Sequence, residues 1–139
     1  MDAFDADVLI YAAVHGHPLG RRIKVLFATE PGSQAGVGSV LLLPEILAKP
    51  MRDGRAEELT ALTGLLSRLE LLVFDAVTAE VATSLAATHR LRAADAVHLA
   101  TAVVAGADRF VTNNRQDFPE TLTDIDVTYP DTLPDPSAS

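Results

Sequence analysis

Short apolar runs alternate along the first part of the chain with segments of helical spacing. Residues 4–10 predict a buried strand that leads into a helix over residues 11–14. Over residues 19–29 the apolar side chains recur at helical intervals between basic ones, which predicts a helix. Residues 30–38 are rich in glycine and serine and predict a loop. The valine and leucine run 39–43 then predicts a strand that is buried on both faces.

Leucine positions organise the middle of the chain. Pro44 and Glu45 are expected to open a helix, because proline is tolerated in the first helical turn. A proline and a glycine within residues 49–55 indicate a loop. After that loop, one face of a further helix is formed by the leucines at positions 59, 62, 65, 66 and 69. Residues 71–74 predict a third strand.

Two more helices are expected in the second half of the chain. Thr78 is a suitable N-cap for a helix that runs to about Thr88. After a short basic segment, a second helix is expected to begin at residue 93 or 94 and to end at Gly106. Asp95 would then lie in the first turn of that helix.

The last strands complete an α/β pattern. Residues 109–112 and 125–129 predict strands on either side of a polar turn at 113–118. Strands separated by helices, some of them apolar throughout, predict a three-layer α/β/α fold with a mostly parallel central sheet. A chain of 139 residues suits one domain, which we assign to residues 1–130. Proline, aspartate and serine dominate residues 131–139, the composition of a flexible tail.

The net charge of the chain limits how it can bind a polyanion. Eleven lysines and arginines against nineteen aspartates and glutamates give a formal charge of −8. The molecule as a whole therefore has no electrostatic attraction for a nucleic-acid backbone. A polyanionic substrate would need local help, either from a bound cation or from the small basic groups Arg21, Arg22 and Lys24 or Arg52 and Arg55.

Residue types that are missing narrow the possible chemistry. Cysteine is absent, which excludes disulfides, zinc–thiolate sites and cysteine nucleophiles. The first residues lack the basic region of a signal peptide, and the apolar runs are too short to cross a bilayer. We therefore expect a cytoplasmic protein with no membrane association, whose chemistry depends on carboxylates, histidines and hydroxyls.

Four acidic residues lie at predicted strand ends, helix starts or adjacent turns: Asp5, Glu45, Asp95 and Asp117. A parallel sheet brings such places together, because ligands bind beyond the carboxyl ends of its strands. Converging carboxylates either acquire raised pKa values or bind a hard cation such as Mg²⁺ or Mn²⁺. A bound metal would lower the pKa of a water molecule and neutralise the charge that develops during phosphodiester cleavage. Taken singly, each residue also has a structural explanation as a helix cap or turn residue.

Three further polar residues have two interpretations each. Asp7 would either help to bind a metal or be a hydrogen-bonded neighbour, and we favour the second. His98 follows Asp95 by one helical turn and could pair with it, although a packed helix histidine is the favoured interpretation. Thr112 would either order a metal-bound water or be an ordinary strand residue.

The order and spacing of several motifs resemble a PIN domain, and within that group the VapC ribonuclease toxins of bacterial toxin–antitoxin pairs. The motifs are FDADVLIY at residues 4–11, LPEIL at 43–47, ADAVHLATA at 94–102, GADRFVTNNR at 106–115, and Asp117 with Phe118. Each motif alone is weakly specific, but the resemblance covers almost the whole chain.

The resemblance implies a metal site and an activity. Asp5, Glu45 and Asp95 match the three acidic metal positions of the family, and Thr112 matches a hydroxyl position beside the site. Many relatives carry an acid where this chain has Asn114, whereas others use the later aspartate that Asp117 matches. The implied function is a divalent-metal-dependent endoribonuclease that uses Mg²⁺ or Mn²⁺ to hydrolyse RNA. Toxins of this kind are typically homodimers that a cognate antitoxin protein silences.

Three alternatives remain open from the sequence. Residues 4–8 also fit the nucleophile motif of a haloacid-dehalogenase-like phosphohydrolase, with Asp5 phosphorylated and Asp7 as acid and base. That enzyme needs a later lysine, but the last lysine of the chain is Lys49. Asn114 and the negative charge instead suit a PIN-like scaffold that binds RNA or a partner with little catalysis. The third alternative is an RNA-processing nuclease without an antitoxin.

Overall fold

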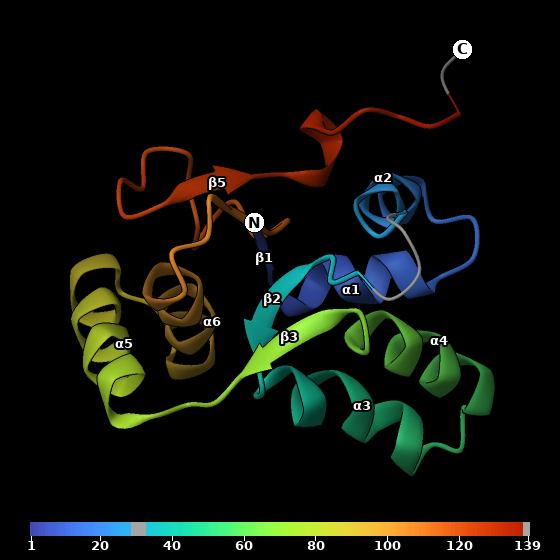
Figure 1. Ribbon diagram of the computed structural model, residues 1–139, viewed down its shortest axis with the longest axis horizontal. Coiled ribbons are helices and arrows are strands. Elements are labelled where there is room, and N and C mark those ends of the chain that lie inside the picture. The colour runs from blue at the N-terminus through green and yellow to red at the C-terminus, as the bar shows by residue number, and fades with distance from the viewer. Residues whose placement is uncertain (29–32, 138–139) are drawn as a thin grey trace.

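The computed structural model describes residues 1–28 and 33–137 and has a parallel sheet at its centre. The sheet has five strands in the order β3-β2-β1-β4-β5, and every neighbouring pair is parallel (Figure 1). The predicted α/β class with a mostly parallel sheet is confirmed. The strands are β1 Asp2–Phe4, β2 Gly36–Ser39, β3 Leu69–Leu72, β4 Arg109–Val111 and β5 Asp126–Thr128.

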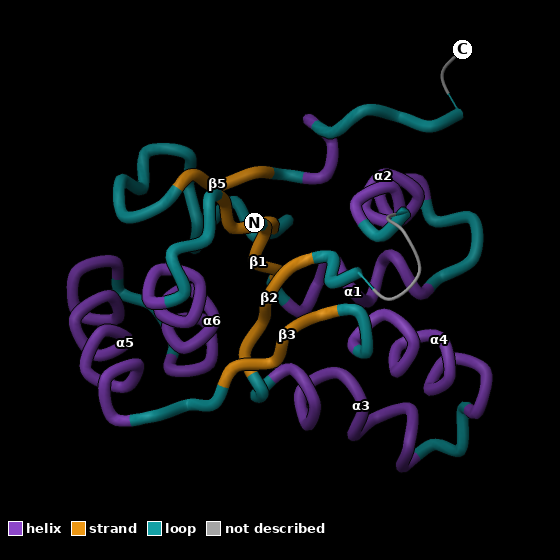
Figure 2. Tube along the Cα trace, viewed as in Figure 1, coloured by secondary structure: helices purple, strands orange, loops and turns teal. Residues whose placement is uncertain are grey.

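Helices cover both faces of this sheet. They are α1 Ala6–Ala13, α2 Pro18–Leu26, α3 Leu42–Arg52, α4 Ala56–Leu66, α5 Ala76–His89 and α6 Ala93–Val104. Figure 2 shows α5 and α6 on one side of the strands and α1, α3 and α4 on the other. The structure therefore has the predicted three layers.

Successive side chains of the central strands pack alternately into two separate hydrophobic cores. Ala3 of β1 and Phe110 of β4 belong to the core beneath α5 and α6. The next residues, Phe4 and Val111, belong to the core shared with α1 to α4. This period of two is the geometry of a strand, and burial on both faces explains why these strands are apolar throughout.

The first strand is shorter than the sequence predicts. It ends at Phe4, and α1 begins at Ala6, so the prediction of a strand over residues 4–10 is wrong. The reason is Asp5, whose side chain accepts a hydrogen bond from the backbone N–H of Ala6 and caps the helix. The apolar run that follows is buried at helical spacing, through Val8, Leu9 and Ala12.

The second strand and the third helix also begin earlier than expected. β2 lies mostly in the segment predicted as a loop, and the predicted strand at 39–43 contains the last residue of β2, a turn and the first two residues of α3. The glycines of β2 explain the difference, because a Cβ at Gly36 would collide with the carbonyl oxygen of Asp2 in the neighbouring strand. The predicted helix at 19–29 corresponds to α2, whereas residues 29–32 of the helix and loop predictions lie outside the described residues.

Three other predicted boundaries are corrected by the structure. The expected loop at 49–55 is largely the end of α3, which runs to Arg52 with a proline inside it. The third strand begins at Leu69, two residues before the predicted start. The N-cap of α5 is Asp75 and not Thr78, because the Asp75 carboxylate accepts from both the backbone N–H and the hydroxyl of Thr78.

The chain after β5 packs its first residues against the domain. A 3₁₀ turn, η1, spans Pro130–Thr132, and Leu133 behind it is buried. The Arg22 side chain of α2 donates to the carbonyl oxygens of Asp131 and Leu133, each over 2.8 Å. The start of the segment that we expect to be flexible, residues 131–139, is thus in contact with α2, and its last two residues lie outside the described part. No helix among the described residues is both long and apolar enough to span a membrane.

Candidate active site

The acidic candidates gather at the carboxyl edge of the sheet. Asp5 directly follows β1, and Thr112 directly follows β4, its neighbour in the sheet. Glu45 and Asp95 lie in the first turns of α3 and α6. The charge of Glu45 raises the pKa values of both Asp5 and Asp95, and the charge of Asp5 also raises the pKa of Asp95, so the fold brings these three carboxylates within electrostatic range.

Asp5 is buried at the centre of this group, with a relative exposure of 5%. Its Oδ1 accepts from the backbone N–H of Ala6 at 2.8 Å, and its Oδ2 accepts from the Thr112 hydroxyl at 2.8 Å. Burial raises the pKa of Asp5, and the bond from Thr112 only partly offsets that effect. The structural interpretation of Asp5 as a helix cap is confirmed, and its second oxygen is held by Thr112 at the end of the neighbouring strand. Its role as a metal ligand stays a prediction.

Asp7 is closer to the site than the sequence indicates. Its Oδ2 accepts from the backbone N–H of Asn113 at 3.0 Å, and its Oδ1 accepts from Val8 N at 2.7 Å. It is thus the hydrogen-bonded neighbour that we favoured. Burial, followed by the charge of Asp5, also raises the pKa of Asp7 to about 7. In the sequence, only the separation of two residues between Asp5 and Asp7 indicates that their charges interact.

Glu45 is held by a histidine that sequence reasoning did not pair with it. The distance between His98 Nε2 and Glu45 Oε2 is 2.6 Å, and the two residues are 53 positions apart. The His98 side chain is fully buried, which confirms the packed helix histidine. Burial alone would lower the pKa of His98, but the Glu45 bond and the charge of Asp5 outweigh it, so the pKa of His98 is raised.

Asp95, in the first turn of α6, is also surrounded by acidic side chains. Burial raises its pKa first, and the charges of Asp5 and Asp117 raise it further. Asp117 therefore acts electrostatically on Asp95, although the two come from different elements. That the four carboxylates form one metal site stays a prediction.

The turn after β4 connects Asp117 to the buried hydroxyl of Thr112. The Asn114 amide donates to Asp117 Oδ2 at 2.9 Å, and its carbonyl oxygen accepts from Asp117 N at 3.2 Å. The backbone N–H of Asn114 donates to Thr112 Oγ1 at 3.1 Å. Asn114 thus stands where an acid would add charge, and it orients Asp117 instead.

The donor set suits a hard cation, although its side chains do not form a closed ligand shell. Within residues 1–28 and 33–137, no three acidic or histidine side chains lie close enough together to hold a metal ion as they stand. No lysine or arginine of this part of the chain forms an ion pair with the four candidate carboxylates. Glu45 is paired with His98, whereas the raised pKa values of Asp5 and Asp95 indicate that these two carboxylates would be stabilised by protons or by a cation with a preference for oxygen ligands.

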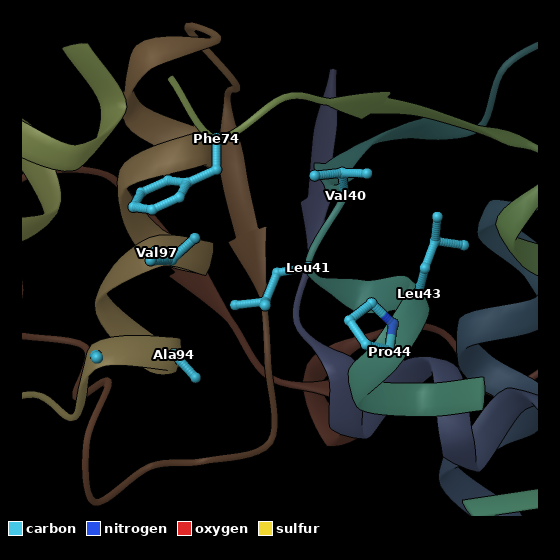
Figure 3. A pocket seen from close by; sticks show the side chains of 8 residues that line it. Val40, Leu41, Leu43, Pro44, Phe74, Ala94 and Val97 are labelled. Carbon is cyan, nitrogen blue, oxygen red and sulfur yellow. The ribbon is translucent and has the colours of Figure 1, made fainter. Parts of the chain in front are cut away.

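An apolar groove borders this acidic edge. It encloses about 640 Å³ and is lined by Val40, Leu41, Leu43, Pro44, Phe74, Ala93, Ala94 and Val97 (Figure 3). Two of the lining residues, Pro44 and Ala94, directly precede Glu45 and Asp95 in the chain, so the groove adjoins the helix starts that carry these carboxylates. Its lining contains no charged side chain and offers nothing to bind a phosphate.

Solved structures with a similar fold come from toxin–antitoxin complexes. A toxin–antitoxin complex from Klebsiella pneumoniae aligns with 22% identity and a TM-score of 0.71, covering 94% of this chain and 98% of that one. VapBC2 from Rickettsia felis, bound to a promoter DNA fragment, aligns with 18% identity and a TM-score of 0.71, covering 92% and 97%. DNA-bound VapBC from Salmonella typhimurium aligns with 21% identity and a TM-score of 0.73, covering 93% and 97%. At these identities the likeness concerns the fold.

The family itself is identified by sequence. No curated protein matches the chain. The family model of the PIN domain matches residues 3–121, which include all four candidate carboxylates and both supporting residues, Thr112 and Asn114. The match favours the PIN interpretation of residues 4–8 over the phosphohydrolase one. On this match, which spans most of its length, the chain belongs to the PIN domain family.

Proposed function

We propose that the chain is a divalent-metal-dependent endoribonuclease and the toxin of a type II toxin–antitoxin pair. The observation that carries the proposal is the placement of Asp5 after β1 and of Glu45 and Asp95 in the first turns of α3 and α6, at one edge of a PIN-domain sheet. The charges of Asp5, Asp117 and Glu45 all raise the pKa of Asp95 there. PIN domains of VapC toxins are generally nucleases, and the family generally uses divalent metals. The similar solved structures, all toxin–antitoxin complexes, also support the proposal.

The proposed site residues have different tasks. Asp5, Glu45, Asp95 and Asp117 would hold Mg²⁺ or Mn²⁺ through carboxylate oxygens. When bound, the metal supplies a water of lowered pKa and neutralises charge on the scissile phosphate. Thr112 keeps one Asp5 oxygen in a fixed direction.

Two neighbours of the carboxylates complete the arrangement. Asn114 holds Asp117 through its side-chain amide. Burial, followed by the charge of Asp5, raises the pKa of Asp7 to about 7, so Asp7 would gain or lose a proton near neutral pH.

Partners follow from the same proposal. The substrate is RNA, and the inhibitor is a cognate antitoxin protein, for which a net charge of −8 favours a basic binding segment. We also propose a homodimer in the cytoplasm, as in the toxins that the motifs resemble. Co-purification with the product of a neighbouring small open reading frame would separate a toxin from an RNA-processing enzyme that has no antitoxin.

A second candidate function is favoured by one observation. Because no three acidic or histidine side chains in the described ranges stand ready to hold a metal, a PIN-like scaffold that binds RNA or a partner with little catalysis also fits. The neutral Asn114, with both polar ends of its side chain bonded to Asp117, is consistent with that alternative. The two candidates differ in whether RNA is cleaved.

The deciding experiment is cleavage of a structured RNA pool by the purified protein with Mg²⁺, Mn²⁺ or EDTA. Asp95→Asn is compared with Asp126→Asn, the same substitution at an exposed aspartate of β5. The nuclease requires cleavage that depends on metal, is lost in Asp95→Asn and persists in Asp126→Asn. RNA binding without cleavage under every metal condition would favour the scaffold.

A further inference from the structure

The contact between His98 and Glu45 joins the two helices that carry proposed metal ligands. His98 lies three residues after Asp95, one turn along α6, and Glu45 lies in the first turn of α3. Nε2 of His98 and Oε2 of Glu45 are 2.6 Å apart, the length of a strong hydrogen bond to a charged acceptor. This single bond therefore sets the direction of the Glu45 carboxylate relative to the helix of Asp95.

Burial is unequal across this bond. The His98 side chain has no solvent exposure, whereas the Glu45 side chain keeps 35% of its surface exposed. Water would satisfy a Glu45 carboxylate at that exposure, so Glu45 does not need the histidine to avoid a desolvation cost. The bond from His98 holds one oxygen of this partly exposed glutamate and so restricts the rotation of its side chain.

The other ring nitrogen indicates that the histidine was not placed for its own satisfaction. Nδ1 of His98 is buried and has no hydrogen-bond partner among the described residues. An unpaired buried polar atom costs free energy that an apolar side chain of similar size, such as leucine, would avoid. The cost is understandable if the Nε2–H group is needed to orient Glu45.

We infer that His98 is a positioning residue that fixes the Glu45 carboxylate beside Asp95 and so contributes to cation binding at the carboxyl edge of the sheet. The inference rests on the proposed function, because it assumes that Glu45 is a metal ligand. Groups that hydrogen-bond to ligating carboxylates commonly change metal affinity about 10-fold to 100-fold when they are removed. His98 itself is not placed to bind a metal in this arrangement, since its Nε2 is bonded to Glu45 and its Nδ1 is buried.

The test measures Mn²⁺ affinity by calorimetry, without RNA, in five proteins: the wild type, His98→Leu, His98→Gln, Glu45→Gln and the double variant Glu45→Gln with His98→Leu. His98→Leu removes the donor and fills a similar volume, and His98→Gln keeps an amide N–H near the position of Nε2. We expect His98→Leu to weaken Mn²⁺ binding about 10-fold or more and His98→Gln to remain within about threefold of the wild type. In a Glu45→Gln background, adding His98→Leu should weaken binding no further, because its effect acts through the Glu45 carboxylate.

Several results would overturn the inference. They are wild-type Mn²⁺ affinity in His98→Leu, a loss in His98→Gln as large as in His98→Leu, and a full additional loss in the Glu45→Gln background. Thermal unfolding without metal is measured beside each titration, and a folded His98→Leu with weakened binding excludes simple loss of structure. Wild-type protein that binds Mn²⁺ but cleaves no RNA would contradict the nuclease and leave the role of His98 supported, whereas wild-type protein that binds no Mn²⁺ would overturn the inference.

Discussion

The hydroxyl of Thr112 donates to Oδ2 of Asp5 over 2.8 Å, and both side chains are buried. The same hydroxyl oxygen accepts from the backbone N–H of Asn114, so it connects the end of β4 to the turn that carries Asp117. One buried hydroxyl thus orients an acidic side chain after β1 and the loop after β4. The residue is 107 positions away from Asp5, and only the parallel pairing of β1 with β4 makes them neighbours.

Thr112→Val should damage the site and the fold together. Valine keeps the volume but leaves Asp5 Oδ2 and Asn114 N without partners, at a cost of about 1–3 kcal/mol in the free energy of unfolding. We expect the rate of RNA cleavage to fall about 10-fold. Thr112→Ser keeps the hydroxyl, so its losses in the free energy of unfolding and in the cleavage rate should each be less than half of those in Thr112→Val. Urea unfolding and cleavage rates measure both, and equal behaviour of the two variants would contradict the proposed role of the hydroxyl.

The raised pKa of Asp7 predicts a pH dependence of stability in the metal-free protein. Its pKa is about 7 in the folded chain against an ordinary value of 3.8, so the folded state binds more protons between these limits. The free energy of unfolding should therefore decrease as the pH rises from about 4 to about 7, and Asp5 and Asp95 act in the same direction.

Urea unfolding in EDTA at pH 5 and pH 7.5 tests this dependence. Asp7→Asn should lose less stability than the wild type between the two pH values, because an amide does not titrate. Asp126→Asn, an equal change of charge at an exposed position, should lose as much as the wild type. A wild-type pH dependence in Asp7→Asn would show that Asp7 is not the titrating group.

A bound cation should stabilise the folded protein, because it offsets the repulsion among the candidate carboxylates. At a Mg²⁺ or Mn²⁺ concentration about 10 times the dissociation constant, binding to the folded state alone adds about 1.4 kcal/mol to stability. For a domain of this size that is a rise in Tm of about 5 °C. Scanning calorimetry should detect this rise in the wild type and in Asp126→Asn but not in Asp95→Asn. A rise of equal size in Asp95→Asn would place the cation elsewhere.

The class of the fold could be predicted because apolar segments alone determine it. Strands such as β4, buried on both faces, need only a bounded apolar run, and helices such as α6 need only their spacing and a terminal glycine. Element boundaries failed where one side chain changed the backbone. Asp5 capped a helix inside an apolar run, and Gly36 stood in a strand because the backbone of the neighbouring strand comes too close for a side chain.

The candidate site residues could be chosen from the sequence, but their contacts could not. Asp95 was expected in the first turn of a helix, where it lies, whereas the helix that Asp5 caps was not expected to begin there. The bond between Glu45 and His98 depends on how α3 and α6 approach each other, and no spacing along one element contains that information. The bond between Asn114 and Asp117 joins residues that are close in sequence. It could not be predicted, however, without knowing that the turn also bonds back to Thr112.

The placement of α1, which follows Asp5 and carries Asp7, depends on one glycine in α2. A Cβ at Gly20 would overlap the carbonyl oxygen of Tyr11, a backbone atom that cannot rotate away. Gly20→Ala should therefore lower the free energy of unfolding by about 1–3 kcal/mol. Gly64→Ala is the matched control, since Gly64 lies in α4 with no heavy atom near its Cβ position, and it should gain about 0.5–1 kcal/mol. Urea unfolding of both variants checks the contrast, and a stabilised Gly20→Ala would mean that α1 and α2 do not pack as described.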